Sequence, residues 1–187
     1  MGHEMPSLSE LILAARQLGR DGFVARYPEP VLLCRRSAAQ PSPDWSFRTQ
    51  TIDVDRRMLA AMLAKERLTV SDEVLRYEVF PLKKTQNNPW RNRVSVGRAR
   101  NNDVVLIDGS VSKLHAHFTI GPEGRLSLQD ASSRNGTTVR GRKLESAEPV
   151  PVALGDEIAF GRLETVLLDA GRLFDFIAGQ VVSAAGA

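Results

Sequence analysis

The sequence predicts a mainly β protein, in which a β-sandwich is preceded by a small α/β extension and followed by a short helix. From Leu68 onward, short runs of Val, Ile, Leu and Phe alternate with turn clusters such as NND, GPEG, SRNG and LGDE. Many short strands separated by regular turns are typical of a sandwich. The run from His115 to Ile120 alternates so that one face turns inward. With 187 residues the chain can hold one such domain and an extension.

A helix is predicted over Ser7–Leu18 at the start of the extension. Ser7 and Glu10 have the spacing of a capping box, in which each side chain accepts a hydrogen bond from the backbone of the other residue. Apolar residues then recur at helical spacing until Gly19, which we expect to end the helix.

The rest of the extension is predicted to contain two strands and a second helix. Pro28 and Pro30 frame a strand at Val31–Arg35; a further strand at Phe47–Val54 precedes a helix at Asp55–Arg67. The closing helix is expected within Gly171–Val182. These elements give three expected parts: 1–70 as the extension, 71–169 as the sandwich domain, and 170–187 as the C-terminal helix and tail.

Composition and charge narrow the class of protein. The apolar fraction of 42% and charged fraction of 25% are those of a globular protein, and no apolar run approaches the length of a membrane span. The N-terminus lacks the basic segment of a secretory signal, so no such signal is expected. The single Cys34 excludes an internal disulfide, and its apolar surroundings favour a structural thiol over a nucleophile.

The segment from Val79 to Asn102 carries six basic residues and no acidic one. This surplus favours an anionic partner, either nucleic acid or phosphorylated protein, although a solvated loop has the same composition. His115 and His117 with the remote Cys34 make a poor zinc set, so no metal or other cofactor is expected.

Three polar clusters interrupt the strands of the sandwich: Gly97–Arg98, Ser112–His115 and Ser132–Thr137. A rigid β scaffold usually presents binding groups on loops, and these clusters together would form a small anion site. The guanidinium of Arg98 suits a phosphate, and the Ser112 hydroxyl is a further donor. Taken singly, the same residues are also compatible with a surface arginine, a turn serine and an Asn-Gly hairpin turn.

The polar clusters belong to sequence blocks that follow one another in a specific order. Gly-Arg, then NNDVVL, VSKLHA, DASSRNGTTVRG and LGDEIAFG follow one another between Tyr77 and Leu168. This order resembles the forkhead-associated (FHA) domain. The resemblance implies a sandwich of about eleven strands that binds phosphothreonine peptides through loops at one end.

The resemblance also implies a role for each matching residue. Arg98 would grip the phosphate and Ser112 would donate its hydroxyl to it. Lys113 and Arg134 would flank the phosphate.

Further matching positions concern the peptide and the framework. Asn135 would hold the peptide main chain just after the phosphothreonine. Val139 and Arg140 lie in the loop that, in the family, helps to read the residue three places further on. Gly97, His115 and Gly136 would shape the loops, and no residue would be catalytic.

The resemblance therefore implies phosphothreonine-dependent protein binding in the cytoplasmic Ser/Thr-kinase signalling of a bacterium, with a kinase or a kinase substrate as partner. No membrane or small-molecule substrate is expected. Ser112, His115 and Asp130 have the composition of a catalytic triad, but no G-x-S-x-G motif accompanies them. A phosphate-independent scaffold stays open as an alternative. Nucleic-acid binding is a weaker one, because no known nucleic-acid-binding pattern occurs.

Overall fold

The computed structural model describes residues 7–35, 61, 68–70, 74–86, 88–145 and 148–183. The chain divides into two compact units. One consists of Glu29–Cys34 and Phe80–Asp169 and is called the sandwich unit here; the other draws on Met1–Pro28, Arg35–Val79 and Ala170–Ala187. Within the described part of the chain, no helix has the length and apolarity that crossing a membrane requires. The predicted boundaries after residues 70 and 169 stay predictions.

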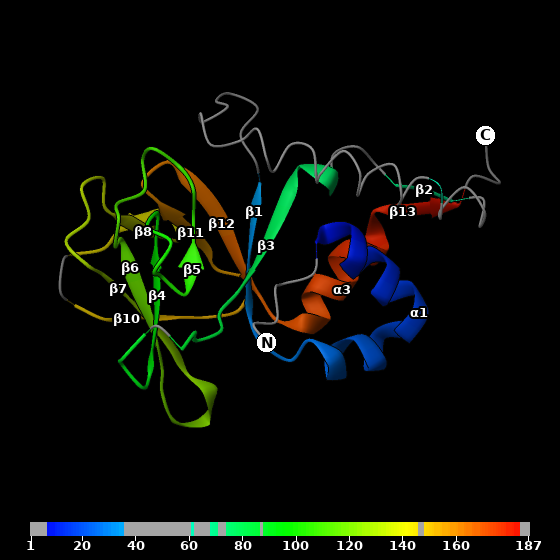
Figure 1. Cartoon of the computed structure of the whole chain (residues 1–187), viewed down its shortest axis with the longest axis horizontal. Helices are drawn as coiled ribbons and strands as arrows, with labels where there is room; N and C mark the ends of the chain where they lie inside the picture. Colours follow the sequence, from blue (N-terminus) through cyan, green and yellow to red (C-terminus); the bar gives the residue numbers. More distant parts are fainter. Residues whose placement is uncertain are drawn as a thin grey trace. The chain divides into compact units, whose positions relative to one another are not determined.

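The sandwich consists of two sheets with eleven strands, which confirms the predicted fold class (Figure 1). The six-stranded sheet has the order β3-β1-β12-β11-β8-β9. Its strands are β1 (Val31–Arg35), β3 (Tyr77–Pro81), β8 (Thr137–Val139), β9 (Arg142–Lys143), β11 (Glu157–Phe160) and β12 (Leu163–Leu168). The five-stranded sheet has the order β10-β7-β6-β4-β5. Its strands are β4 (Arg93–Gly97), β5 (Val104–Val105), β6 (Ala116–Ile120), β7 (Leu126–Asp130) and β10 (Val150–Val152).

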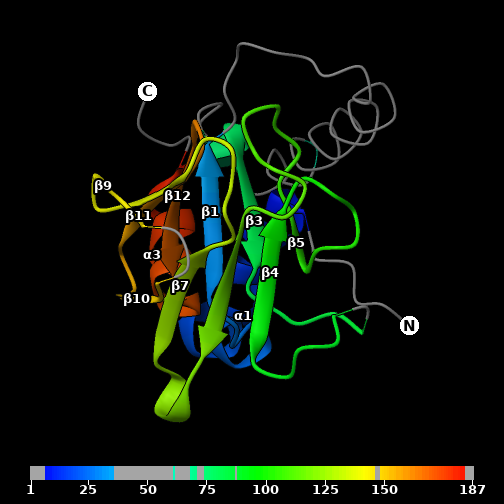
Figure 2. The same cartoon turned by 90° about the vertical axis from the view of Figure 1, so that its left-hand side faces the viewer.

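Strand β1 forms where the two prolines predicted it and lies between β3 and β12 (Figure 2). It pairs antiparallel with β12, from Val31 opposite Leu168 to Cys34 opposite Thr165. Residues Val31–Cys34 are all buried. A segment far from the other strands in sequence therefore completes the interior of the six-stranded sheet.

The core lies between the two sheets. In strand β6, Ala116 and Phe118 face this core and are fully buried, whereas His117 and Thr119 on the opposite face are partly exposed. This is the alternation that the sequence predicted. Phe160 of β11 belongs to the same buried cluster as Phe118. The core thus provides a rigid base for the loops that leave its strands.

The second unit contains helix α1 (Leu8–Arg26) and confirms the predicted capping box. The Ser7 backbone nitrogen donates to the Glu10 carboxylate at 2.6 Å, and the Glu10 nitrogen donates to Ser7 Oγ at 3.3 Å. Gly19, predicted to end the helix, has non-helical angles (φ +64°, ψ −178°) at a kink between two helical segments. The second segment, which runs on to Arg26, was not predicted. Glycine tolerates that backbone angle without a steric penalty.

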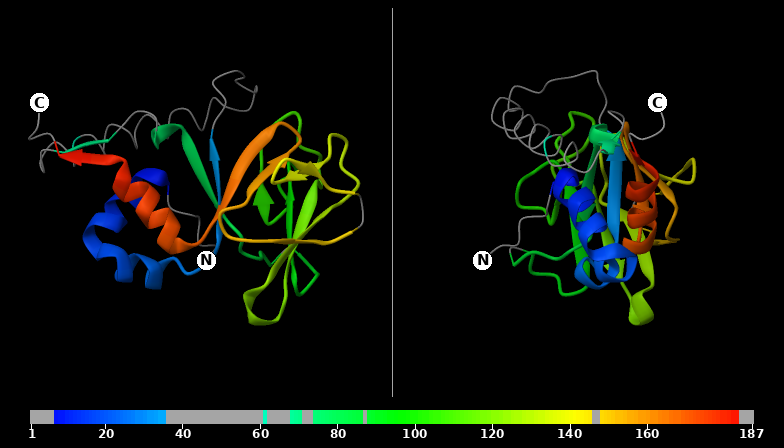
Figure 3. Two further views of the ribbon diagram at one scale, coloured as in Figure 1. Left: turned by 180° about the vertical axis from the view of Figure 1, so that it is seen from behind. Right: turned by 90° about the vertical axis from the view of Figure 1, so that its right-hand side faces the viewer.

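Helix α3 (Ala170–Gly179) packs beside α1 within this unit (Figure 3). The ring of Phe23 on α1 lies 5.7 Å from that of Phe174 on α3. The predicted C-terminal helix is present but ends earlier than expected. Residues Val181–Ser183 form strand β13, which pairs with β2 (Leu68–Val70). The strand predicted at Phe47–Val54 and, apart from Ala61, the helix predicted at Asp55–Arg67 lie outside the described residues.

Candidate functional site

The three predicted polar clusters lie on three loops of the sandwich unit that are joined to one another. They are residues 98–103 between β4 and β5, residues 106–115 between β5 and β6, and residues 131–136 between β7 and β8. The Arg98 nitrogen donates to the Ser112 carbonyl at 2.9 Å, which joins the first loop to the second. Asn135 Nδ2 donates to the Ser110 carbonyl at 2.7 Å, which joins the third loop to the second. The structure therefore brings the clusters together as predicted.

Gly97 permits the close contact between the first two loops. A Cβ atom at Gly97 would lie 2.3 Å from the Lys113 carbonyl oxygen and 2.8 Å from Asn102 Nδ2. The Asn102 side chain donates to this same carbonyl at 2.7 Å. Because backbone cannot move aside as a flexible side chain can, any residue larger than glycine would push the loops apart.

Three cationic side chains on these loops have no ion-pair partner in the described part of the chain. Arg98, Lys113 and Arg134 are all exposed, and none has an ion-pair partner among the residues that the structure describes. Two cations elsewhere in the same unit do form ion pairs: Arg125 with Glu123 at 3.0 Å and Arg140 with Asp156 at 3.3 Å. The loops therefore present positive charge that is available to an external anion.

The Ser112 hydroxyl is placed to donate a hydrogen bond. Its oxygen accepts from the Arg134 backbone nitrogen at 2.9 Å, and Ser112 is only half-buried. Within the described ranges the hydroxyl donates to no other residue. Because a hydroxyl is both an acceptor and a donor, its hydrogen is left for a ligand oxygen.

His115 is fully buried beneath the loops, where both ring nitrogens bind backbone groups. The Ser112 nitrogen donates to Nδ1 at 3.0 Å, so the ring proton resides on Nε2, which donates to the Gly136 carbonyl at 3.1 Å. Burial lowers the pKa of His115, although the bond to Gly136 and the charge of Asp130 oppose this effect. The ring is therefore neutral and bridges the second and third loops.

Asp130 stabilises the third loop through hydrogen bonds to its carboxylate. Its carboxylate accepts from the Ser133 nitrogen at 2.8 Å, from Ser133 Oγ at 2.7 Å and from Thr137 Oγ1 at 2.6 Å. Burial raises the pKa of Asp130, but these hydrogen bonds and the nearby His115 outweigh it and lower the pKa below its ordinary value. The Ser133 hydroxyl also accepts from the Gly136 nitrogen at 2.9 Å. Sequence reasoning missed this network, although the short Asp-x-x-Ser spacing is typical of a side-chain-stabilised turn.

Asp103 has a similar role at the first loop and was also missed. It accepts hydrogen bonds from Thr85, Asn88 and Ser95. Burial raises the pKa of Asp103, but the bonds from the Thr85 and Ser95 backbone and from side chains outweigh it and lower the pKa. The carboxylate thereby attaches the segment before β4 to the strand that leads to Arg98.

Asn135 is exposed at the top of the third loop. Its Nδ2 atom is used in the bond to Ser110, whereas its side-chain oxygen has no partner in the described part of the chain. An amide oxygen in that position can accept from a main-chain N–H of a bound peptide. The following Gly136 adopts φ +81°, a backbone angle that favours glycine.

Val139 and Arg140 are placed differently from the other predicted residues. The Val139 side chain is buried in the core between the sheets. The Arg140 guanidinium donates to the Pro151 carbonyl at 3.1 Å and pairs with Asp156. Both side chains are therefore engaged by the sandwich itself, and the Arg140 nitrogen also donates to the Glu157 carbonyl at 2.9 Å.

The arrangement does not provide a catalytic triad. In an active triad the histidine would accept the proton of the serine hydroxyl. Here both nitrogens of His115 bind backbone groups, and the Ser112 oxygen accepts from Arg134. Across the described residues, no group of three or more His, Cys, Asp or Glu side chains forms a metal site.

Comparison with known proteins agrees with the motifs and the fold. Residues 94–161 match the family model of the FHA domain. The glycogen accumulation regulator GarA of Mycolicibacterium smegmatis is 36% identical over 74 residues, which cover 40% of this chain and 44% of GarA. The oxoglutarate dehydrogenase inhibitor of Corynebacterium glutamicum is 38% identical over 74 residues, covering 40% and 49% of the two chains. The chain thus spans about half the length of the curated relatives it matches.

Among solved structures, the FHA domain of the CT664 protein from Chlamydia trachomatis aligns with a TM-score of 0.43 at 28% identity. The alignment covers 55% of this chain and 94% of that one. The family match and the order of the motifs on the sandwich identify the class of domain: this chain contains an FHA domain.

Proposed function

We propose that this FHA domain binds a phosphothreonine-containing segment of a protein partner in the three joined loops. The observation that carries the proposal is that the exposed cations Arg98, Lys113 and Arg134, which form no ion pair with the described residues, lie on the joined loops that also carry the Ser112 hydroxyl. A phosphothreonine carries about −1.5 to −2 charges and three strong acceptor oxygens at neutral pH. The loops offer the complementary charge and donors.

Each residue has a distinct part in this proposal. The Arg98 guanidinium binds two phosphate oxygens as a planar fork, and the Ser112 hydroxyl donates to the same phosphate. Lys113 and Arg134 add charge at the flanks. Gly97, His115 and Gly136 act as framework, because each fixes a contact between loops.

Peptide residues beyond the phosphothreonine would meet the third loop and the turn after β8. The free side-chain oxygen of Asn135 accepts from the peptide main chain. Val139 and Arg140 contribute by fixing the position of their turn beside the peptide, since their side chains are held by the core and by Asp156. Specificity for side chains that follow the phosphothreonine then depends on other residues.

We further infer that the protein acts by binding and not by catalysis. By their names, the two relatives are a regulator and an enzyme inhibitor. The triad arrangement is absent, since both His115 nitrogens are occupied by backbone. The partner is then a kinase or a kinase substrate in Ser/Thr-kinase signalling. A cytoplasmic location is part of this proposal, and the buried free thiol of Cys34 is compatible with a reducing compartment.

The decisive experiment compares wild-type protein with Arg98→Ala against a phosphothreonine peptide library and its unphosphorylated counterpart. Arg91→Ala is the matched control, because it removes the same charge from an exposed residue outside the three loops. We expect Arg98→Ala to weaken phosphopeptide binding by about 2–5 kcal/mol, the usual cost of removing one partner of a hydrogen-bonded charge pair. Calorimetric titration measures it.

Two outcomes would contradict the proposal. Equal phosphopeptide affinity of wild type and Arg98→Ala would show that these loops do not bind the phosphate. Equal binding of phosphorylated and unphosphorylated peptides would favour a phosphate-independent scaffold. Nucleic-acid binding is tested separately by a duplex titration at several salt concentrations, because phosphate-driven binding weakens steeply with salt.

A further inference from the structure

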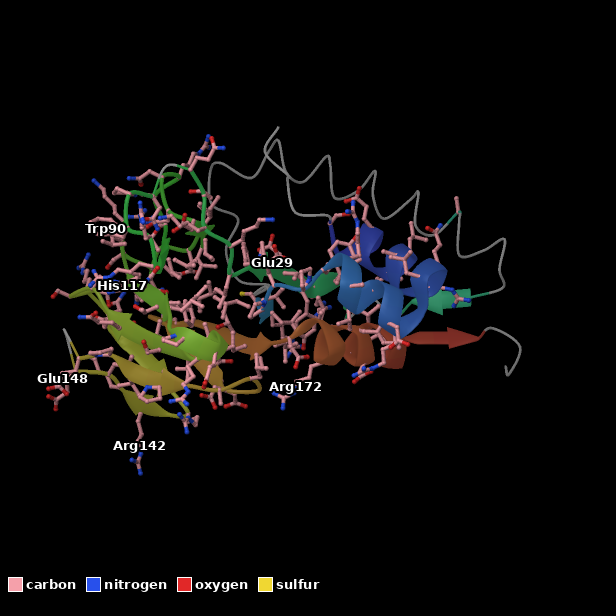
Figure 4. The ribbon with its side chains drawn as sticks, turned by 90° about the horizontal axis from the view of Figure 1, so that it is seen from below. Glu29, Trp90, His117, Arg142, Glu148 and Arg172 are labelled. Carbon is pink, nitrogen blue, oxygen red and sulfur yellow. The ribbon has the colours of Figure 1, made fainter. Side chains whose placement is uncertain are left out.

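Trp90 is an exposed tryptophan on the segment that leads into β4. Its side chain is 55% exposed, although tryptophan is highly buried on average in folded proteins. In the part of the chain that the structure describes, no other large apolar side chain is as exposed. Figure 4 shows Trp90 on the periphery of the sandwich unit. An exposed tryptophan is typical of the residues that dominate the binding energy of protein interfaces.

The backbone that presents Trp90 is held by hydrogen bonds. The Trp90 nitrogen donates to Asn88 Oδ1 at 3.0 Å. The Asn88 amide is buried, and its Nδ2 donates to the Arg93 carbonyl at 2.7 Å and to the Asp103 carboxylate. The Trp90 carbonyl accepts from the Arg93 nitrogen at 3.4 Å and from Lys84 Nζ. Because this turn is fixed before a partner arrives, binding to it loses less conformational entropy.

Positive charge lies beside Trp90. Lys84 reaches its carbonyl, and the exposed Arg93 closes the same turn. Neither cation forms an ion pair with a described residue. One carboxylate is present there, that of Asp103, and it accepts hydrogen bonds from Thr85 and from two further residues. Two cations and one carboxylate leave positive charge in excess, in agreement with the basic composition of this segment.

Arg93 extends the charged surface onto the outer face of the five-stranded sheet. It lies opposite Thr119 of β6, which lies opposite Ser127 of β7. Opposite residues of a ladder point to the same side, and Thr119 is on the face turned away from the core. Burial lowers the pKa of His117 on this face; the bond to Gln129 opposes the effect, and the charge of Arg93 adds to it. None of the outward-facing residues of these three strands is acidic.

We propose that Lys84, Trp90 and Arg93 form a docking surface for an acidic, unphosphorylated segment of a protein partner. The Trp90 ring contacts an apolar side chain of that segment, and the two cations pair with its aspartate or glutamate side chains. A nucleic acid is a poorer fit, because strand binding stacks successive bases on several rings. Among the described residues, Trp90 is the only exposed Trp, Tyr or Phe.

This docking surface is separate from the three loops that carry Arg98. Strand β4 begins at Arg93 and ends at Gly97, directly before Arg98. A strand rises about 3.3 Å per residue, so roughly 16 Å separate the backbone of Arg93 from that of Arg98. One partner can therefore occupy both sites, and the second contact then strengthens the first. The docking of an acidic segment does not depend on phosphothreonine binding.

The test follows the fluorescence of Trp90 in the full chain. The sequence has two tryptophans, so Trp45→Phe leaves Trp90 as the single reporter. The probes are unphosphorylated peptides in which aspartate and glutamate are interspersed with leucine. Their counterparts carry asparagine and glutamine instead. Acidic peptides should shift the Trp90 emission to the blue as the ring leaves water, and added salt should weaken the binding. Calorimetric titration of the unsubstituted chain gives the affinity.

Three variants locate the binding. Trp90→Ala should weaken binding of the acidic peptides by about thirtyfold, as for a dominant interface residue. Arg93→Gln should weaken it by about two- to fivefold, the range of an exposed ion pair. Arg142→Gln is the matched control, because Figure 4 shows this arginine of β9 extending away from the sandwich on a different side from Trp90. Thermal unfolding of all three should match the wild type, since the three side chains are exposed.

The outcomes separate the docking surface from the phosphothreonine site. Arg98→Ala should keep its affinity for the acidic peptides, and Trp90→Ala should keep its affinity for a phosphothreonine peptide. If Arg98→Ala abolishes binding of the acidic peptides, their carboxylates imitate phosphate in the loops and the docking surface is overturned. It is also overturned if neutral peptides bind equally, if Trp90→Ala binds like the wild type, or if only single-stranded DNA or phosphatidylserine vesicles shift the emission. The phosphothreonine site is decided by its own titration.

Discussion

The Oγ atom of Ser112 lies 2.9 Å from the backbone nitrogen of Arg134, 22 residues further along the chain, and accepts a hydrogen bond from it. The Ser112 hydroxyl therefore joins two loops by accepting a hydrogen bond, and its own hydrogen remains available for donation to a ligand. The same atom is thus both part of the framework and part of the proposed phosphate site.

Replacing Ser112 with alanine should remove both contacts. We expect phosphothreonine peptide affinity to fall by about 1.5–3 kcal/mol, the net value of a hydrogen bond to a charged group. Ser112→Thr, which keeps the hydroxyl, should bind better than Ser112→Ala. Calorimetric titration of the three proteins gives the comparison, and unchanged affinity of Ser112→Ala would exclude its hydroxyl as a ligand.

Gly97→Ala should separate the first two loops. The new methyl would lie 2.3 Å from the Lys113 carbonyl oxygen, so the backbone carrying Arg98 or Lys113 has to shift. We expect a loss of about 1–3 kcal/mol in the free energy of unfolding, as for overpacking elsewhere in proteins. Phosphopeptide affinity should also fall, because Arg98 moves relative to Ser112. Urea unfolding and peptide titration measure the two effects.

Gly109→Ala is the control for that variant. Gly109 lies on the second loop, and no atom comes within 4 Å of its added Cβ. Its stability and its affinity should stay near those of the wild type. A Gly97→Ala protein that behaved like Gly109→Ala would show that the close contact is not required.

Asp130→Ala should loosen the third loop without touching the ligand. It leaves the buried Thr137 hydroxyl and the Ser133 nitrogen without their acceptor. Unsatisfied buried donors cost about 1–3 kcal/mol, which should appear as a lower free energy of unfolding. Hydrogen exchange of the Gly136 amide should accelerate, since Ser133 Oγ is no longer fixed. Wild-type stability and exchange in this variant would contradict the assigned role.

Stability should fall as the pH drops below the ordinary histidine value of 6.5. Burial lowers the pKa of His115 in the folded state, so the unfolded chain binds more protons in this range. Burial also lowers the pKa of His117, an effect that Arg93 supports and the bond to Gln129 opposes. The stability is fully present above the unfolded pKa and is lost as the pH falls toward the folded one.

Urea unfolding at a series of pH values tests this expectation, with histidine NMR titration to assign it. Resonances of His115 and His117 should titrate below pH 6.5 in the folded protein. The carboxylates of Asp103 and Asp130, whose pKa values lie below the ordinary 3.8, should add to the loss only at more acidic pH. Stability independent of pH between neutrality and pH 5 would contradict the neutral, buried His115.

Local signals made much of the fold predictable from sequence. The capping box at Ser7 and Glu10 needs only neighbouring residues, and the alternation in β6 follows from strand geometry. The order of the polar clusters placed Arg98, Ser112 and Asn135 on adjacent loops. The second helical segment after Gly19 was not predicted, because the sequence does not reveal that Phe23 is buried in those turns.

Contacts between distant segments were not predictable in the same way. The partners of Asp130 and Asp103, and the position of Lys143 over Gly136, depend on how separate strands come together. The buried side chain of Val139 and the ion pair of Arg140 likewise follow from packing against neighbouring strands. Motif order identifies which loops matter, whereas three-dimensional packing decides which side chains are available.

The position of β1 between β3 and β12 has a consequence for the order of assembly during synthesis. Val31 leaves the ribosome long before Leu168, its partner across the sheet. The four apolar residues Val31–Cys34 must therefore stay without their β12 partners while most of the chain is made. Pairings of such long sequence separation form late and slowly. The six-stranded sheet therefore becomes continuous only when β12 has emerged, and a ribosome that stalls before Leu163 would hold a half-built sandwich with an exposed strand.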